Sequence, residues 1–247
     1  MNLEFSGTRA LILGGSCDMA LCLAELMIKA GFFPVLTYRS KKGQARISDV
    51  LKDFAGRYGT SFLDFSDRAS LVQIFKEDAA CPDFMVDFVQ SDLECLIASV
   101  DPDDIYRYFN QNISFRAEVL RRVVRMMLVQ KRGRLVYISS SAAVRPNPGQ
   151  GFYCAAKLAS EALYKNLGLE LAGSGITTVT LRPGYIDGGR GREFIRKDPD
   201  ASIGRVPIKR ALTSKEVAET ILFYLSESAR GFNATEISLD GGLTAGK

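Results

Sequence analysis

Histidine is absent from the 247-residue chain. Without it, the protein cannot be a Ser-His-Asp or Cys-His hydrolase, and it cannot use a histidine general base. Zinc sites that need imidazole ligands are excluded for the same reason, and we expect no metal site. Proton transfer near neutral pH must therefore depend on Tyr, Lys, Asp, Glu, Cys or Ser side chains.

Long hydrophobic runs and a signal sequence are also missing. No stretch approaches the roughly 18 uncharged apolar residues that a membrane-spanning helix requires. The first seven residues, Met-Asn-Leu-Glu-Phe-Ser-Gly, contain neither the basic region nor the apolar segment of a signal peptide. The five cysteines include no Cys-x-x-Cys pair, and their odd number favours reduced thiols. We therefore expect a cytoplasmic protein that does not associate with membranes.

The net charge is weak for a nucleic-acid-binding protein. The chain has 32 Lys and Arg residues against 28 Asp and Glu residues, which leaves only +4. We therefore expect no nucleic-acid partner. Hydrophobic residues make up 47% and charged residues 24% of the chain, and these values are typical of a globular protein rather than a disordered one.

Short aliphatic or β-branched runs alternate with amphipathic stretches along the whole chain. This alternation is typical of βαβ units and a parallel sheet, and right-handed crossovers then produce a doubly wound Rossmann fold. We predict an α/β protein with a single domain, residues 1–247, and about seven strands flanked by helices on both faces. The expected strands are 9–13, 34–38, 61–64, 84–89, 134–138, 176–181 and 236–239, and the expected helices are 19–30, 43–57, 68–79, 103–131, 151–173 and 214–227.

The first predicted strand leads directly into a glycine-rich turn, Gly14-Gly-Ser-Cys-Asp-Met-Ala20, and then into a helix. The free backbone N–H groups and the dipole of such a helix N-terminus attract a pyrophosphate. The turn therefore favours dinucleotide binding, with contacts from Gly14, Ser16, Asp18 and Met19. The carboxylate of Asp18 would repel the pyrophosphate unless it points away. An ordinary βα turn without a ligand is the alternative.

The end of the second predicted strand distinguishes between two cofactors. NAD-binding Rossmann proteins place an acidic residue there to bind the ribose, whereas NADP-binding ones use a cation for the 2′-phosphate. Here the strand is followed by Arg39, Ser40, Lys41 and Lys42, with no acidic residue. We therefore favour NADP(H), bound by Arg39 and Ser40. A solvated helix start is the alternative.

Four polar residues form a pattern that resembles the short-chain dehydrogenase/reductase family. Tyr153-Cys-Ala-Ala-Lys157 has the form Tyr-x-x-x-Lys, Ser140 precedes Tyr153 by thirteen residues, and Asn112 lies in the preceding predicted helix. A lone Tyr-x-x-x-Lys is weak evidence, but the serine, the asparagine and the glycine turn together make the resemblance specific. It covers nearly the whole chain, and the β-ketoacyl thioester reductases are the most similar members.

The resemblance implies catalytic roles for these four residues. Tyr153 and Lys157 are four residues apart, so they share one helix face. A phenol has a free pKa near 10, and the Lys157 cation would lower it. Tyr153 would donate a proton to a substrate carbonyl while NADPH delivers a hydride, and Ser140 would polarise that carbonyl. Asn112 would link Lys157 to solvent through water.

The resemblance also implies further cofactor contacts and an assembly. The C-terminal Leu239-Asp-Gly-Gly242 matches a segment of tetrameric members, so we expect a homotetramer, or a homodimer. The additional cofactor contacts that we expect are Asp64 and Phe65 beside the adenine, Val89 after the fourth strand, Pro183, Gly184 and Ile186 beside the nicotinamide, and Tyr153 and Lys157 at the nicotinamide ribose.

The chain departs from the family pattern in its cofactor-binding region. Asp87-Phe-Val-Gln90 stands where the family has Asn-Asn-Ala-Gly, Asp18 replaces a glycine, and Leu13 replaces a threonine. The expected catalytic residues are thus present, whereas the residues expected to bind the cofactor differ from the family pattern. Either altered contacts hold the cofactor, or its affinity is weak.

Two clusters of basic residues suit an anionic substrate carrier, such as coenzyme A or an acyl carrier protein. One lies on the predicted helix 103–131 and after it, and the other lies in segment 184–206, a predicted mobile loop with a short helix that would cover the substrate. Solvated surface is the alternative for both. The clusters consist of Arg116, Arg121, Arg122, Arg125, Lys131, Arg132 and Arg134, and of Arg190, Arg192, Arg196, Lys197 and Arg205.

Three functional hypotheses follow from these patterns. The first is an NADPH-dependent carbonyl reductase that acts on a 3-oxoacyl thioester. The second keeps this mechanism and replaces the substrate by a ketone or alcohol of specialised metabolism. The third is a non-catalytic partner subunit of a related reductase, which the unusual cofactor-binding residues favour and the intact catalytic residues oppose.

Overall fold

The computed structural model describes residues 3–75 and 80–246, apart from the side chains of residues 190 and 201. Within these ranges, seven parallel strands form one sheet in the order β3-β2-β1-β4-β5-β6-β7. The order reverses between β1 and β4, as in doubly wound folds. The strands are β1 (Arg9–Leu13), β2 (Phe33–Tyr38), β3 (Gly59–Phe62), β4 (Phe84–Asp87), β5 (Gly133–Ile138), β6 (Ile176–Pro183) and β7 (Thr235–Leu239).

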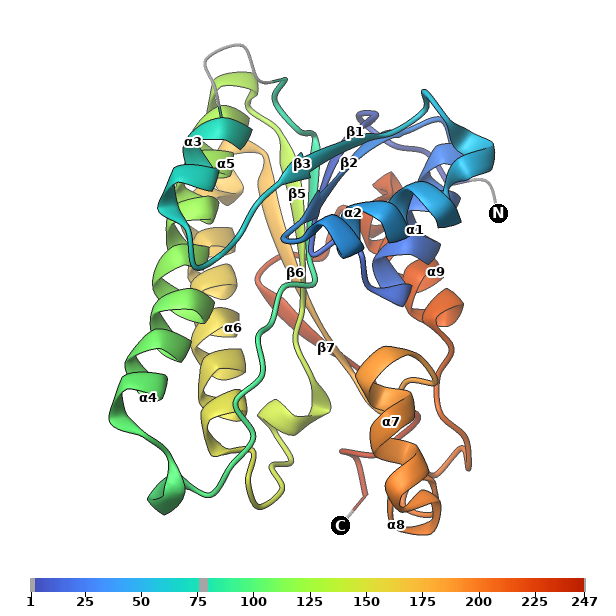
Figure 1. Cartoon of the computed structure of the whole chain (residues 1–247). Coiled ribbons are helices and arrows are strands. Elements are labelled where there is room, and N and C mark those ends of the chain that lie inside the picture. The colour runs from blue at the N-terminus through green and yellow to red at the C-terminus, as the bar shows by residue number, and fades with distance from the viewer. Residues whose placement is uncertain (1–2, 76–79, 247) are drawn as a thin grey trace.

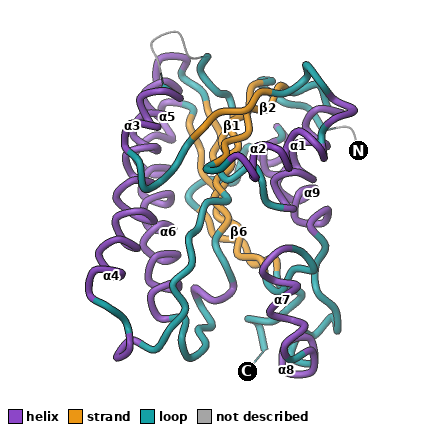
Figure 2. The backbone as a smooth tube through the Cα atoms, viewed as in Figure 1, coloured by secondary structure: helices purple, strands orange, loops and turns teal. Residues whose placement is uncertain are grey.

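Helices cover both faces of the sheet, as Figures 1 and 2 show. One face carries α1 (Asp18–Lys29), α2 (Lys41–Val50) and α9 (Ser214–Leu225), and the other carries α3 (Arg68–Ile74), α4 (Pro102–Phe109), α5 (Phe115–Gln130) and α6 (Gly151–Leu171). Two short helices, α7 (Gly189–Lys197) and α8 (Pro199–Ile203), lie beyond the end of β6.

The hydrophobic core consists of two layers, one on each face of the sheet. Strands that are covered on both faces have nearly continuous apolar sequences, and β4 illustrates this with Phe84, Met85 and Val86, which are all buried. One layer joins the sheet to α1 and α9, and the other joins it to α5 and α6. This packing fixes the carboxyl ends of the parallel strands along one edge.

The α/β class and the seven-stranded parallel sheet confirm the predicted fold. Three predicted segments differ in detail. The predicted helix 43–57 stops at Val50, and a 3₁₀ turn at Lys52–Phe54 leads to Gly56, whose φ of +80° does not continue a helix. The predicted helix 103–131 is divided by a π-helical turn at Asn110–Ser114. The segment 184–206 contains two helices instead of one.

Part of one prediction lies outside the described residues. The structure shows α3 within the predicted helix 68–79, where Asp67 caps the helix by accepting a hydrogen bond from the N–H of Ala69 at 2.9 Å. Residues 76–79 are not described. Among the helices that are described, none is both long and apolar enough to cross a membrane.

Candidate active site

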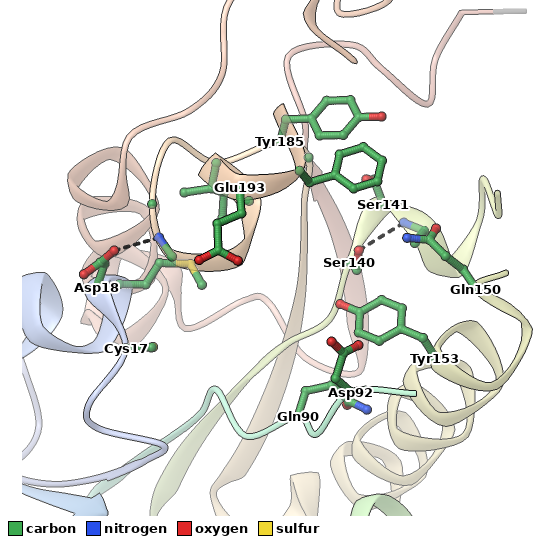
Figure 3. A pocket seen from close by; sticks show the side chains of 18 of the residues that line it. Cys17, Asp18, Gln90, Asp92, Ser140, Ser141, Gln150, Tyr153, Tyr185 and Glu193 are labelled. Carbon is green, nitrogen blue, oxygen red and sulfur yellow. Dashed lines mark hydrogen bonds between the residues drawn. The ribbon is translucent and has the colours of Figure 1, made fainter. Parts of the chain in front are cut away.

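A pocket of about 530 Å³ opens at the carboxyl ends of the strands, where ligands bind in doubly wound sheets. Most of its walls come from the start of α1, the segment after β4, the segment from the end of β5 to the start of α6, and the segment after β6 (Figure 3). Arg46, Ser214 and Leu243 complete the lining of the pocket. The predicted site residues that line it are Asp18, Met19, Ser140, Tyr153, Gly184 and Ile186.

Ser140 and Tyr153 face the same space in this pocket (Figure 3). Ser140 follows β5, and its Oγ accepts a hydrogen bond from the N–H of Ala142 at 3.1 Å. This bond fixes the position of the serine oxygen and leaves its O–H free to donate. Tyr153 lies in the first turn of α6. The fold therefore brings together the two hydroxyl groups that the sequence pattern indicated.

Lys157 lies one helical turn after Tyr153 and is buried. Its Nζ donates a hydrogen bond to the carbonyl oxygen of Ile138 at 2.7 Å. The same nitrogen lies 5.8 Å from the centre of the Tyr153 ring and 5.0 Å from that of Tyr137. Burial raises the pKa of Tyr137, so this second phenol stays neutral. The arrangement places one cation behind Tyr153, away from the open side of the pocket.

Asn112 lies in the π-helical turn and bonds to the segment after β4. Its Oδ1 accepts a hydrogen bond from the N–H of Ser91 at 3.0 Å, and its Nδ2 donates to the hydroxyl of Ser91 at 2.5 Å and to the carbonyl of Tyr108 at 2.8 Å. Its own carbonyl accepts a hydrogen bond from Nη1 of Arg116. The side-chain oxygen and amide group are thus both occupied by protein partners.

A buried ion pair lies where the family has its Asn-Asn-Ala-Gly turn. Asp87 and Arg116 are both fully buried, and Oδ2 of Asp87 accepts hydrogen bonds from Nε of Arg116 at 2.8 Å and from the hydroxyl of Tyr164 at 3.0 Å. Burial lowers the pKa of Arg116, but the carboxylate of Asp87 outweighs this effect and holds the pKa above its ordinary value. The guanidinium of Arg116 therefore stays charged although it is buried.

The guanidinium of Arg116 also connects the pocket wall to the helix that carries Tyr153. It donates hydrogen bonds to the carbonyl of Val89 and, at 2.8 Å, to the hydroxyl of Ser160 in α6. The assignment of Arg116 to a basic surface is therefore wrong. The side chain points inward because Asp87, at the end of a buried strand, supplies the opposite charge that makes its burial possible.

The glycine turn has the features of a pyrophosphate site. Gly14 has a φ of +72°, which glycine adopts without strain, and a Cβ atom on it would lie only 3.2 Å from Cγ2 of Val89. Cys17, the residue that precedes α1, provides no side-chain acceptor for the helix. The first N–H groups of α1 therefore remain available to an anion, and the residues present fit a dinucleotide.

Asp18 takes part in a bridge across the mouth of the pocket. Its Oδ1 accepts a hydrogen bond from Nη2 of Arg46 in α2, and its Oδ2 accepts one from the N–H of Gly189 at 2.8 Å. Figure 3 shows the second bond as a dashed line. The Arg46 cation partly neutralises the carboxylate, which stays in the first turn of α1, close to the proposed pyrophosphate site.

The residues predicted to bind the adenosine part of the cofactor lie around the ends of β2 and β3. Arg39 and Ser40 are exposed, and Oγ of Ser40 caps α2 by accepting a hydrogen bond from the N–H of Gly43 at 3.1 Å. The side chain of Ser16 lies beside Gly43, since a Cβ atom there would be 3.3 Å from Oγ of Ser16. Asp64 accepts hydrogen bonds from the N–H and hydroxyl groups of Ser66 at 2.9 and 2.7 Å.

Two other predicted cofactor positions are shaped by packing. The ring of Phe65 stacks on Phe115 in the core, with a centroid distance of 4.7 Å, so only its backbone is left to face a ligand. Pro183 is the last residue of β6. Gly184 follows it, and a Cβ atom there would lie 2.9 Å from Cα of Asp240. Only glycine allows this close approach.

Sequence analysis missed several polar residues that line the pocket. Gln90, Asp92 and Glu94 follow β4, and Gln150 precedes α6. Nε2 of Gln150 donates to Glu94 at 3.2 Å, and Oε1 of Gln90 is buried with no hydrogen-bond partner among the described residues. Their position directly after a buried strand was the available signal, because all strand ends meet at this edge.

The segment after β6 forms the opposite wall of the pocket. Tyr185 and Phe194 stack with their ring centres 5.8 Å apart, and both line the cavity. Lys197 and Arg205, from the second predicted basic cluster, line it as well. The side chain of Arg190 lies outside the described part of the structure. This wall thus combines an aromatic surface with positive charge.

Comparisons with known proteins agree with this fold. The model of a family described as enoyl-(acyl carrier protein) reductase matches residues 16–244. The 3-oxoacyl-[acyl-carrier-protein] reductase FabG of Vibrio harveyi is 25% identical over 243 residues, which cover 98% of this chain and 99% of that protein. FabG of Haemophilus influenzae is 26% identical over 237 residues, covering 96% and 98% of the two chains.

Solved structures share the fold over the full length. A protein described as a short chain dehydrogenase/reductase family protein has a TM-score of 0.87 at 23% identity, with 100% of both chains covered. YwfH, described as an NADPH dependent reductase involved in bacilysin biosynthesis, has a TM-score of 0.89 at 21% identity, covering 98% of this chain and 100% of its own. The family match over residues 16–244 and this shared fold show that the chain belongs to the short-chain dehydrogenase/reductase family of NAD(P)-dependent oxidoreductases.

Proposed function

We propose that the protein is an NADPH-dependent carbonyl reductase that converts a ketone to a secondary alcohol. The observation that carries this proposal is the presence of the Ser140 and Tyr153 hydroxyls in one pocket, with Lys157 one helical turn behind Tyr153. Tyr153 can donate a proton, Ser140 can donate a hydrogen bond to a carbonyl, and Lys157 supplies a positive charge. These three roles require neither a metal ion nor a histidine.

The proposed mechanism assigns one task to each of these residues. Ser140 donates a hydrogen bond to the substrate carbonyl and orients it, and Tyr153 gives its proton to the carbonyl oxygen. Lys157 favours the phenolate that remains, because an opposite charge stabilises an anion. Positioned acid–base groups of this kind contribute roughly 10²–10⁴-fold to a rate. When bound, the reduced nicotinamide supplies a hydride to the carbonyl carbon.

The cofactor would lie across the carboxyl ends of the strands. The N-terminus of α1 and Gly14 would receive the pyrophosphate, and Arg39 with Ser40 would bind the 2′-phosphate. The proposed contacts on the remaining length of NADP(H) are Ser16, Asp18, Met19, Asp64, Phe65, Val89, Pro183, Gly184 and Ile186, with Tyr153 and Lys157 at the nicotinamide ribose.

The proposed substrate is a 3-oxoacyl thioester of coenzyme A or an acyl carrier protein. Arg145, Lys197 and Arg205 line the pocket and suit the anionic carrier, and the FabG relatives are named for such substrates. Asp92 and Glu94 on the opposite wall favour a second candidate, a small polar ketone. We also propose a homotetramer, in which β7, at the edge of the sheet, lies in a subunit contact.

A fluorescence titration with NADPH and, separately, NADH tests the proposed function first. We expect NADPH to bind much more tightly than NADH, and a panel of 3-oxoacyl thioesters and small ketones then identifies the substrate class. If neither nucleotide binds, the reductase proposal fails, and the non-catalytic partner subunit becomes the better explanation.

Replacing Arg39 by alanine should weaken NADPH binding while NADH binding stays within about twofold. A hydrogen bond to a charged group is worth about 1.5–3 kcal/mol, so the dissociation constant for NADPH should rise by roughly one to two orders of magnitude. The same titration measures both constants, and Lys52→Ala, at an exposed position of the following 3₁₀ turn, is the control. Equal losses for the two nucleotides would mean that Arg39 does not bind the 2′-phosphate.

The variant Asp18→Asn should bind NADPH more tightly than the wild-type protein. Removing a negative charge beside a bound anion at a helix N-terminus changes the energy by about 0.3–1 kcal/mol, which corresponds to roughly a two- to fivefold lower dissociation constant. The asparagine oxygen can still accept the hydrogen bond from Gly189. Glu25→Gln, near the far end of α1, should change nothing. Weaker binding by Asp18→Asn would show that the carboxylate assists the cofactor.

A further inference from the structure

The proposed reaction leaves Tyr153 without its proton after each turnover. The proton goes to the carbonyl oxygen, so the phenolate must take another from solvent before the next substrate is reduced. Family resemblance assigns this return path to water molecules between Lys157 and Asn112. The inference that follows rests on the proposed function, because a protein that does not reduce a carbonyl has no such proton to replace.

Asn112 is buried and bonds to several protein groups in this structure. Only 1% of Asn112 and 3% of Lys157 are exposed. The side-chain amide of Asn112 is bonded to Ser91 and Tyr108, and its carbonyl accepts a hydrogen bond from Arg116. Asn112 therefore acts as a clamp on the segment after β4, and the Arg116 guanidinium competes with any water for its backbone carbonyl.

This clamp determines where Asp92 lies. Two hydrogen bonds join Asn112 to the backbone and side chain of Ser91, the residue before Asp92. Asp92 lines the same pocket as Tyr153 and is exposed to solvent. Figure 3 shows its carboxylate pointing toward the hydroxyl of Tyr153. A carboxylate that solvent can reach thus shares the pocket of the reacting phenol.

We infer that Asp92 is the proton-relay residue of the reductase and returns a proton from solvent to Tyr153. A proton from water or a buffer acid binds one oxygen of the Asp92 carboxylate, and the carboxyl group then transfers a proton to the phenolate oxygen of Tyr153. The transfer is downhill, because a phenolate is a far stronger base than a carboxylate. Asp92 ends as a carboxylate and Tyr153 as a phenol, so no oxidant or reductant is consumed.

The relay predicts a specific defect in the variant Asp92→Ala. With NADPH and acetoacetyl-CoA or ethyl acetoacetate, the first turnover should run at the wild-type rate, because Tyr153 starts protonated. Later turnovers should be about 10²-fold slower, since a positioned proton-transfer group is missing. Stopped-flow absorbance of NADPH would then show one rapid turnover per site, followed by a slow phase. Formate, a small acid that can enter the space left by the side chain, should restore the slow phase at least several-fold.

Matched variants separate the relay from a structural role. Asp103→Asn also removes an exposed carboxylate, in the first turn of α4 and outside the residues that line the pocket, and it should keep the wild-type rate in all turnovers. Asp92→Asn has the shape of the native residue, but its amide cannot bind and release a proton. It should therefore show the same slow later turnovers as Asp92→Ala, and formate should not restore them.

Three outcomes would overturn the relay. Steady-state rates of both Asp92 variants within twofold of wild type would show that another group returns the proton. A first turnover that is already slow and does not respond to formate would show that Asp92 only shapes the pocket. If the wild type binds NADPH but reduces neither carbonyl compound, the proposed reduction of such substrates fails and the relay fails with it. Loss confined to the Asp92 variants leaves the proposed function intact.

Discussion

Tyr153→Phe is expected to abolish carbonyl reduction while the affinity for NADPH stays within a few-fold of the wild type. The substitution removes only the hydroxyl, and the ring can keep its place in the first turn of α6. Without that hydroxyl, the proposed acid is missing from the carbonyl that Ser140 is proposed to orient. The rate should fall by at least the roughly 10²–10⁴-fold that general acid catalysis contributes. Steady-state rates with a ketone substrate and a fluorescence titration with NADPH measure the two quantities.

Tyr185→Phe is the matched control for this prediction. Tyr185 also lines the pocket, and its ring stacks on Phe194, so the same loss of a hydroxyl occurs a short way from the proposed chemistry. The control should retain most of the activity. If Tyr153→Phe has near-native activity, Tyr153 is not the acid. If both variants are inactive, activity also requires the hydroxyl of Tyr185, to which the proposed mechanism gives no role.

The fold and the meeting of Ser140 and Tyr153 in one pocket could be predicted from the sequence because both depend on local spacing. Alternating strands and helices specify a parallel sheet, and the carboxyl ends of its strands meet at one edge. Ser140 follows one strand and Tyr153 begins the next helix, so their encounter requires no knowledge of distant packing. Lys157, one turn beyond Tyr153, shares its helix face.

The buried pair of Asp87 and Arg116 could not be predicted in this way. The two residues are separated by 29 positions, and no periodicity relates them. Composition alone suggests that an arginine among six other basic residues is exposed, because charged residues are almost never fully buried unless they are paired. Arg116 is buried because Asp87 is its partner, and this pair forms only when α5 packs against β4.

Asp18 and Asp92 illustrate two other limits of a sequence-based analysis. Asp18 was recognised as unfavourable for a pyrophosphate, but its partners, Arg46 and the N–H of Gly189, come from α2 and from the segment after β6. Asp92 matches no motif at all. Its position depends on the hydrogen bonds between Ser91 and Asn112, which join residues 21 positions apart. Tertiary contacts of this kind leave no pattern in a single sequence.

Arg116→Met is expected to cause the largest loss of stability of the substitutions considered. Methionine fills much of the same volume, but among the described residues it leaves the buried carboxylate of Asp87 with Tyr164 and the N–H of Val89 as its hydrogen-bond partners. Breaking one side of a buried ion pair costs about 3–5 kcal/mol. For a chain of this size, 1 kcal/mol shifts Tm by about 2–4 °C, so Tm should fall by roughly 6–20 °C. Thermal unfolding and urea titration measure the change.

The double variant Asp87→Asn/Arg116→Met separates the cost of an unpaired charge from the loss of packing. An asparagine at position 87 can still accept hydrogen bonds from Tyr164 and Val89 but carries no charge, so the double variant should recover at least half of the lost stability. Arg107→Met breaks the exposed pair with Asp104 and should cost less than about 1 kcal/mol. If the double variant is as unstable as Arg116→Met, the guanidinium stabilises the fold through the carbonyls of Val89 and Asn112 rather than by neutralising Asp87. The substitution would then also loosen Asn112, which holds Ser91 by two hydrogen bonds. Asp92, the next residue, would be held less firmly in the pocket that it shares with Tyr153.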